Sequence, residues 1–294
     1  MRAGLSQLYI QGLVSGILLG GLFALMALGF SLMWRFLRVI NLVHFGMILL
    51  AAYLTYQFAR SSRLDPWIAL VFTIPLFALV GAAVQWVFHR FHVTIFNSLL
   101  VAFGMFVIIE GVIRNVWGAD FLRIPGDVSP YAVMSVSVQG VALPVTRLIA
   151  FGLAIPLSLA AAVFLERSYI GKALRAVAED PDVAVAFGVN FRRISLLVAA
   201  ASGVTGAIAG TLVAVSGTLF PNASQEWIGI VFAVVILGGV GSPTGAVVAS
   251  ILIGAVSGIV SVAWAPAAAP LMAFAVLILV LLWRPHGLFG RTPV

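Results

Sequence analysis

The sequence contains no cysteine, and only 9% of its 294 residues are charged. Without cysteine, the chain has no disulfide, no thiolate nucleophile and no cysteine-ligated metal or iron–sulfur centre. A soluble domain carries about 25% charged residues, so this scarcity of charge excludes a cytosolic enzyme. Apolar residues are abundant instead: they make up 63% of the chain, and the mean hydropathy is +1.18.

The sequence also lacks a cluster of catalytic side chains. Its four histidines, His44, His89, His92 and His286, are too scattered for a local metal motif. No paired carboxylates occur within the apolar runs, so a membrane-embedded enzyme would have no reactive group. We therefore expect no catalytic residue, no metal and no cofactor on this chain.

A phosphate-binding loop is absent as well. Gly171-Lys172 lacks both the upstream glycine and the following Ser or Thr of that motif. Ion-coupled transporters usually carry several ionisable groups within the membrane, and here Glu110 is the one clear example. An ion-coupled secondary transporter acting alone is the alternative from another functional class.

Long apolar runs recur from end to end, which excludes a single-span receptor. A helix needs about 20 apolar residues to cross a bilayer, so eight helices would use about 160; 63% of 294 residues is about 185. The sequence therefore predicts an all-α integral membrane protein, a polytopic helical bundle of about eight to nine transmembrane segments in one domain over 1–294. The expected spans are 8–34, 41–58, 67–88, 95–117, 147–165, 194–219, 228–262 and 267–283.

The count depends on the stretch 228–262, which is broken at Gly238-Gly239-Val240-Gly241-Ser242-Pro243. The residues before the break are too few for a straight full span. A half-helix, a re-entrant segment and a short crossing all fit.

Lysine and arginine are biased toward one side of the predicted membrane. If the polar loop 166–193 is cytoplasmic, ten basic residues fall inside and five outside, and 118–146 becomes an irregular external loop with room for a short hairpin. The inner set is Arg35, Arg38, Arg90, Arg167, Lys172, Arg175, Arg192, Arg193, Arg284 and Arg291. The outer set is Arg2, Arg60, Arg63, Arg123 and Arg147.

Glycines recur every fourth residue in the first span, at Gly12, Gly16 and Gly20, and further glycines follow in 194–219. Small residues on one helix face let two backbones approach closely in lipid. Plain helix packing and a sliding surface for gating are both consistent with this stripe.

Polar residues within the apolar runs are candidates for a translocation path, because buried polar groups in a bilayer must find partners. Asn41 and His44 are candidates of this kind or, alternatively, a helix cap and a histidine bonded to a nearby carbonyl. Glu110 and Arg114, four residues apart on one helix face, form either a self-satisfied pair or a substrate or proton contact. The full set expected along the path is Asn41, His44, Gly46, Glu110, Gly238, Gly239, Gly241 and Ser242.

The loop 166–193 predicts two short helices with a sharp corner. Asp180 suits an N-cap, Pro181 the first helical position and Gly188 a helix stop. Its apolar residues, expected to be exposed, suggest docking into a groove on another protein; an elbow lying on the membrane surface is the alternative. The exposed residues are expected to be Val177, Val183, Val185 and Phe187, and the contact residues Arg175, Val177, Glu179, Asp180, Pro181, Val183, Phe187 and Gly188.

This loop resembles the coupling loop of ABC-importer permeases, and the chain as a whole resembles the LivH/LivM-type permeases of branched-chain (hydrophobic) amino acid ABC transporters, closest to the LivH side. The similarity runs in order over nearly the whole sequence. The matching segments are 27–30, 38–44, 51–53, 171–181, 188–190, 237–245 and 284–290. One departure is Asn41-Leu-Val-His44-Phe45, where family members commonly have Asn-Phe-Ala-His-Gly.

The resemblance implies a permease subunit of an importer in a bacterial inner membrane. It also implies the partners: a second, paralogous permease, two cytoplasmic subunits that bind ATP and Mg, and an external substrate-binding protein. Nucleic acid is not expected as a partner. Related permeases carry leucine-type amino acids, urea, amides or aromatic acids, so the transported solute does not follow from the resemblance.

Overall fold

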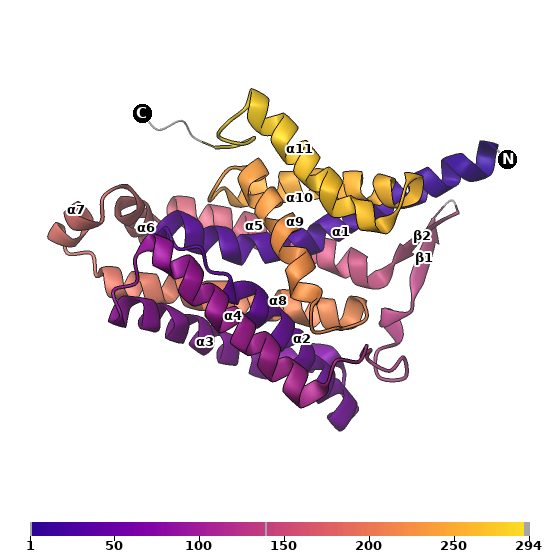
Figure 1. Ribbon diagram of the computed structural model, residues 1–294, viewed down its shortest axis with the longest axis horizontal. Helices are drawn as coiled ribbons and strands as arrows, with labels where there is room; N and C mark the ends of the chain where they lie inside the picture. The colour runs from indigo at the N-terminus through magenta and orange to yellow at the C-terminus, as the bar shows by residue number, and fades with distance from the viewer. Residues whose placement is uncertain (1, 139, 291–294) are drawn as a thin grey trace.

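The computed structural model describes residues 2–138 and 140–290, with the side chains of 2–5, 181 and 182 set aside. Within these residues the chain forms helices almost throughout, with one antiparallel hairpin (Figure 1). The α-helices are α1 (Arg2–Leu37), α2 (Val43–Ser62), α3 (Leu70–Arg90), α4 (Ile95–Trp117), α5 (Val145–Arg167), α6 (Tyr169–Glu179), α7 (Pro181–Ala186), α8 (Phe191–Ser216), α9 (Ala223–Gly238), α10 (Pro243–Ala263) and α11 (Ala269–Trp283). The 3-10 helices are η1 (Pro66–Ala69), η2 (Pro130–Ala132) and η3 (Pro266–Ala268), and the hairpin strands are β1 (Ser135–Val138) and β2 (Val141–Pro144).

Seven helices of the described chain are long and apolar enough to cross a membrane: those of α1, α3, α4, α5, α8, α10 and α11. The fold is therefore the expected polytopic helical bundle. One further apolar helix, α9, has 16 residues, while α2 has 20 residues and is not among the helices of the described chain apolar enough to cross.

The helix α9 runs from one end of the bundle to the other, which favours the short crossing over a re-entrant segment. The residues just before it form a two-hydrogen-bond bridge between Leu219 and Leu122 in the loop after α4. At its far end, the carbonyls of Leu237 and Gly238 accept from the amides of Leu288 and Phe289, which follow α11. Sixteen residues at 1.5 Å each span about 24 Å, short for a bilayer crossing.

The two ends of the bundle differ in structure (Figure 1). We call them the elbow end, which carries α6 and α7, and the hairpin end, which carries β1, β2 and the start of α1. Arg38 binds α6 at the elbow end, and Arg63 pairs with Asp127 at the hairpin end, as the predicted orientation requires. Arg291, assigned to the inner side, lies outside the described residues.

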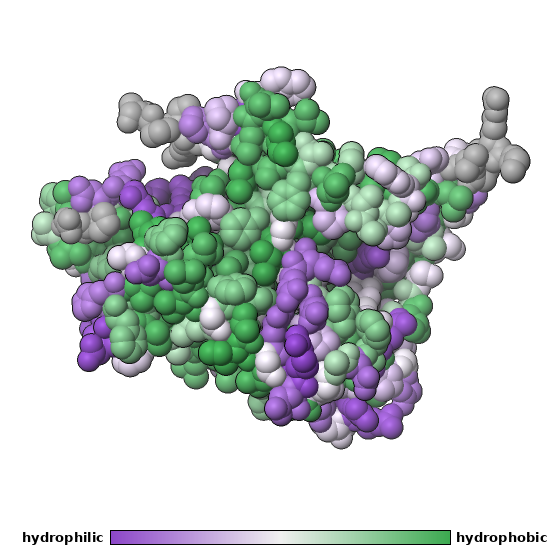
Figure 2. All heavy atoms as spheres, viewed as in Figure 1, coloured by the Kyte–Doolittle hydropathy of each residue, from purple (hydrophilic) through white to green (hydrophobic). Residues whose placement is uncertain are grey.

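Burial separates central helices from peripheral ones. Within the 18-residue apolar stretch of each helix, 67% of the residues are buried in α1 and α8, against 22% in α4 and α5 and 11% in α11. Figure 2 shows the result: hydrophobic residues cover the middle of the surface, over α4 and α11, while hydrophilic residues gather toward the two ends. Exposed apolar side chains on outer helices are expected where the surrounding solvent is lipid.

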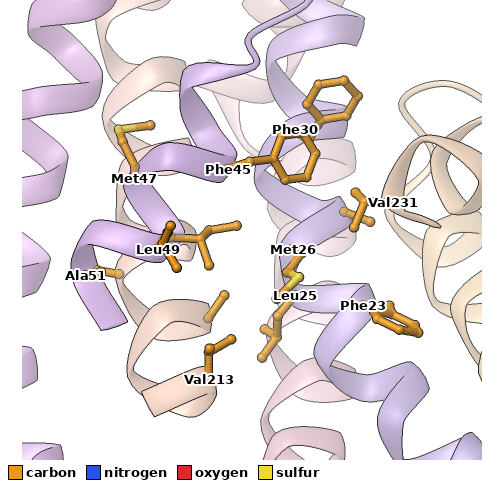
Figure 3. Close-up of a cluster of buried hydrophobic side chains, with 14 of the residues drawn as sticks. Phe23, Leu25, Met26, Phe30, Phe45, Met47, Leu49, Ala51, Val213 and Val231 are labelled. Carbon is orange, nitrogen blue, oxygen red and sulfur yellow. The ribbon is translucent and has the colours of Figure 1, made fainter. Parts of the chain in front are cut away.

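The core lies where α1, α2, α8 and α9 meet (Figure 3). The ring of Phe30 in α1 packs against Phe45 of α2, at a centroid distance of 5.4 Å, and against Phe232 of α9, at 4.8 Å. Such tilted ring pairs stabilise a core beyond the area they bury.

The glycine stripe of α1 is a packing surface for α10. A Cβ at Gly12 would lie 2.8 Å from the carbonyl oxygen of Gly258, and one at Gly20 would lie 2.6 Å from that of Ser250. A Cβ at Gly16 would overlap the carbonyl of Gly254. The two backbones therefore touch over three successive turns, as the packing interpretation predicts.

The external loop contains the predicted hairpin, with Val138 paired to Val141 and Ser135 to Pro144. The hydroxyl of Tyr131 donates to Oδ1 of Asp65 at 2.7 Å. Burial and the nearby carboxylate raise the pKa of Tyr131 well above its usual range, so this hydrogen bond persists at alkaline pH.

Candidate functional site

The elbow between α5 and α8 has the two-helix form predicted from its sequence. Ser168 caps α6, since its Oγ accepts from the amide of Gly171 at 2.9 Å. Asp180 caps α7 through its Oδ1, which accepts from the amide of Val183 at 3.0 Å, and α7 begins at Pro181. Gly188 ends α7 with a φ of +86°, a left-handed conformation that glycine adopts readily.

Three apolar side chains project from this elbow: Phe187 is 86% exposed, Val185 53% and Val183 51%. We call them the α7 patch. The expectation for Val177 was wrong, because this side chain is 2% exposed. It follows Ala173 and Leu174 by one helical turn, and all three lie on the buried face of α6.

Arg175 joins the elbow to α5. Its guanidinium donates to the carbonyl of Leu165 and, at 3.3 Å, to that of Glu166. These carbonyls belong to the last turn of α5, whose acceptors have no partner within the helix. Glu179 and Asp180 at the corner are exposed, so the carboxylates of the elbow remain at the surface.

A second arginine, Arg38, also links the elbow to the bundle, and this link was not predicted from the sequence. Arg38, at the end of α1, has a φ of +51° and donates from Nη2 to the carbonyl of Ala178 in α6 at 3.0 Å. Arg38 begins the connection between α1 and α2. This connection turns back into the bundle, and its residue Asn41 is buried. The sequence signal that could have indicated this bond is Arg38 itself, a cation placed shortly before the buried polar residues Asn41 and His44.

The glycine break lies at the elbow end. Ser242 caps α10, since its Oγ accepts from the amide of Gly245 at 3.0 Å. Gly239 and Gly241 have positive φ values of +91° and +79°, and the carbonyl of Gly241 accepts from the guanidinium of Arg35. A Cβ at Gly238 would lie 2.5 Å from the carbonyl carbon of Gly245, so this corner is closely packed.

A cavity of about 630 Å³ lies between this corner and the elbow. It is bounded by the end of α1, the junction of α5 and α6, and the start of α10. Its polar lining consists of Arg35, Glu166, Arg175, Ser242 and Thr244. Two predicted sets of residues therefore meet at one cavity: Arg175 of the elbow and Ser242 of the break.

The predicted path residues Asn41 and His44 are buried inside the chain. The Oδ1 of Asn41 accepts from the amide of Val43 at 3.1 Å. His44 Nε2 lies 3.0 Å from the carbonyl oxygen of Met26, and Nδ1 lies 3.1 Å from Oγ of Ser202. Since a carbonyl can only accept, Nε2 carries the proton and Nδ1 accepts from the Ser202 hydroxyl. These are the contacts expected from the cap alternative.

The backbone around His44 is shaped to hold the ring. A Cβ at Gly29 would lie 2.6 Å from Cε1 of His44 and would overlap Oγ1 of Thr205. At Gly46, a Cβ would lie 3.3 Å from the Ile109 side chain, a tight contact between α2 and α4. Glycine is therefore needed where α1 passes the imidazole.

Glu110 and Arg114 bind the start of α9, not each other. Glu110 is buried and accepts from Oγ of Ser224 at 2.6 Å and from Nε2 of Gln225 at 3.1 Å. Arg114 donates from Nη2 to Oδ1 of Asn222 at 3.0 Å. A carboxylate beside the first turn of a helix is also favoured by the helix dipole.

No group of three or more His, Cys, Asp or Glu side chains in the described residues is arranged to hold a metal ion. The arrangement instead offers an exposed apolar patch on the elbow, two arginines that hydrogen-bond between the elbow and the bundle, and a polar cavity beside a glycine corner. Those features suit a mechanical coupling between a membrane bundle and a separate protein.

Comparison with known proteins agrees with this geometry. The family described as "Branched-chain amino acid transport system / permease component" matches residues 12–281. The chain is similar to the high-affinity branched-chain amino acid transport system permease proteins LivH of Salmonella typhimurium and LivH of Escherichia coli, at 24% identity over 310 residues each. It is 26% identical over 306 residues to BraD of Pseudomonas aeruginosa, and each match covers 97% of both chains.

No solved structure matches the chain. The family match covers most of α1, most of α11 and every helix between them, including the elbow and the glycine break. The chain therefore belongs to the branched-chain amino acid transport permease family, as a multi-pass membrane permease.

Proposed function

We propose that this permease is the membrane subunit of an ABC importer that carries branched-chain or related hydrophobic amino acids across a bacterial inner membrane. Two partner subunits bind and hydrolyse ATP with Mg, an external protein delivers the solute, and a second, paralogous permease completes the membrane core. The observation that carries the proposal is the α7 patch, which presents Val183, Val185 and Phe187 on the elbow. Permeases of the same family for urea, amides or aromatic acids are the alternative.

The α7 patch is the contact with the ATP-hydrolysing partner. Apolar residues this exposed at the membrane surface are stabilised when a groove on another protein covers them. Closure of the partner around ATP moves the elbow, and the free energy enters through contacts that differ between the two states.

Hydrogen bonds of two arginines transmit that movement into the bundle. Arg175 links α6 to the end of α5, and Arg38 links it to the connection between α1 and α2. Because Asn41 and His44 follow Arg38 within six residues, displacement of the connection reaches the interior of the bundle directly.

The solute path runs along the helices that this movement displaces. The corner at Gly238, Gly239 and Gly241 forms its inner part, beside Ser242 and the polar cavity. Asn41, His44, Gly46 and Glu110 act on the path by fixing where α2 and α9 begin. Irregular backbone in a membrane is tolerated where it faces protein or water, as at such a corner.

The test uses the reconstituted complex with the double variant Val183→Asp/Phe187→Asp. We expect loss of the ATP-hydrolysing subunits on purification and loss of ATP-driven uptake of labelled L-leucine. The matched control is Val136→Asp/Val138→Asp, which changes two exposed valines at the hairpin end. Normal subunit recovery and normal coupled ATP hydrolysis in the elbow variant would reject the proposal.

A second measurement separates the proposal from the ion-coupled alternative. The chain is placed alone in liposomes with an imposed ion gradient and no ATP-hydrolysing subunit. We expect no uphill solute transport, and uphill transport under these conditions would establish the secondary transporter instead.

A further inference from the structure

A second cavity, of about 430 Å³, lies near the hairpin end, away from the elbow and the glycine corner. Residues of α1, α5, α9, α10 and α11 line it, and in Figure 2 the surface is hollowed between α11 and the hairpin, with hydrophilic residues inside the hollow. Its polar lining consists of Gln11, Ser15, Arg147, Ser257 and Ser261. Binding pockets for small ligands have volumes of about 300–1,000 Å³.

Arg147 brings a positive charge to this cavity that no carboxylate neutralises. Its Nη1 donates to Oγ of Ser15 at 2.5 Å and to the Ser15 carbonyl at 3.3 Å. In the described part of the chain the only ion pair is that of Arg63 with Asp127. Arg147 also lies in the first turn of α5, where the helix dipole disfavours a cation. The guanidinium of Arg147 therefore has no anionic partner within the described residues.

The other polar groups leave one further donor free. Ser257 is buried, and its hydroxyl has no hydrogen-bond partner among the described residues. Gln11 is fully engaged, because its amide donates to the carbonyl of Ala142 and accepts from the amide of Ala142 at 2.7 Å. Gln11 therefore fixes the hairpin to α1, while Arg147 remains to meet a ligand and the enclosed Ser257 hydroxyl adds an unpaired polar group to the wall.

The rest of the lining is apolar. Leu19 and Phe23 of α1 and Ile230 of α9 contribute to it. A ligand that fits must combine an anionic group, placed against Arg147, with an apolar body. A free inorganic anion would leave this apolar wall unfilled.

We propose that this cavity is a binding station for the transported amino acid, in which Arg147 holds the carboxylate and the apolar wall receives the side chain. The hydroxyl oxygen of Ser261, whose proton goes to the carbonyl of Ser257, accepts from the ammonium. The inference rests on the proposed function and adds the place where the solute is held between the hairpin end and the glycine corner. A phospholipid, with a phosphate and acyl chains, has the same combination of chemistry, and the test separates the two.

The test uses the complete complex in lipid nanodiscs without the external binding protein, so that only the membrane subunits can bind the solute. Photo-leucine, a diazirine analogue of leucine, is the probe, and the labelled residues are located by mass spectrometry. We expect labelling on the segments of α1 and α10 that line the cavity. Excess L-leucine removes it, whereas isoamylamine, which has the same apolar body and no carboxylate, does not.

The variant Arg147→Gln should reduce this labelling about tenfold or more, because a hydrogen-bonded charge contributes strongly to binding. Arg147→Lys retains the charge and should retain part of the labelling. The control is Arg123→Gln, which removes an exposed arginine of the external loop and should leave the labelling unchanged. The competition by isoamylamine needs no variant, so a folding defect in Arg147→Gln does not obscure the result.

Absence of labelling in the wild-type cavity would overturn the proposal, as would equal competition by isoamylamine or equal labelling of Arg147→Gln. Displacement of the probe by added phosphatidylglycerol but not by leucine would identify a lipid site instead. Uptake of leucine by the wild-type complex is measured in parallel. If uptake persists without cavity labelling, this inference fails alone; if ATP-driven uptake of leucine is absent, the proposed function fails.

Discussion

The guanidinium of Arg38 donates to the carbonyl of Ala178, 140 positions later in the chain, at 3.0 Å. The bond joins the first residue after α1 to the end of α6, which is followed by Asp180 and then by α7. Since Ala178 is near the C-terminus of α6, its carbonyl lacks a partner within the helix, and a cation there is favoured by the helix dipole.

We predict that Arg38→Ala weakens coupling more than it weakens assembly. Without this tie, the elbow moves with less effect on the connection to α2, so ATP hydrolysis continues while less solute is carried for each ATP. The measurement is the ratio of solute uptake to phosphate release in proteoliposomes. Arg90→Ala, which removes an exposed arginine at the elbow end, should leave the ratio unchanged; an equal fall in both variants would contradict the prediction.

Val177 and Phe187 should respond in opposite ways to the same substitution. Val177→Asp places a carboxyl on the buried face of α6, so we expect a loss of stability of about 2 kcal/mol or more and a lower midpoint of thermal unfolding. Phe187→Asp changes an exposed side chain and should leave the midpoint nearly unchanged while reducing recovery of the ATP-hydrolysing partner. Similar unfolding midpoints for the two variants would contradict this assignment.

Gly254→Ala should destabilise the protein, because the added Cβ overlaps the backbone carbonyl of Gly16 in α1. Backbone atoms cannot rotate away as a flexible side chain can, so the two helices must separate. Gly111→Ala in α4 is the control, since nothing lies within 4 Å of its Cβ position, and alanine favours a helix over glycine by about 1 kcal/mol. Thermal unfolding in detergent should show a lower midpoint for the first variant and an unchanged or higher one for the second.

Glu110→Ala should release the start of α9, because it leaves the hydroxyl of Ser224 buried without its acceptor. We expect a cost of about 1–3 kcal/mol, measured by unfolding. The double variant with Ser224→Ala should cost less than the sum of the two single changes, since both remove one interaction. Glu226→Ala, which removes an exposed carboxylate in the same turn of α9, should cost less than Glu110→Ala.

Local signals in the sequence predicted the elbow well. An N-cap at Asp180, a proline at the first position of α7 and a stop at Gly188 depend on neighbouring residues, which the sequence places directly. Val177 was misassigned because the loop was treated as uniformly exposed. Its position one turn after Ala173 and Leu174 already indicated a buried helical face.

Partners distant in the sequence could not be predicted. The spacing of Glu110 and Arg114 suggests a pair on one helix, but their hydrogen bonds go to α9, more than 100 residues later. Similarly, Asn41 and His44 were recognised as buried polar residues, whereas Ser202, 158 positions from His44, is identified by the tertiary structure alone. Hydrogen-bond satisfaction in a membrane requires a partner without specifying which one.

The glycine stripe also determines which parts of this protein can move independently. At Gly16 and Gly20 the backbones of α1 and α10 touch directly, so we expect the two helices to move together. This helix pair ends beside the corner where the guanidinium of Arg35 donates to the carbonyl of Gly241. We therefore expect a displacement at that corner to be carried along both helices to the hairpin end.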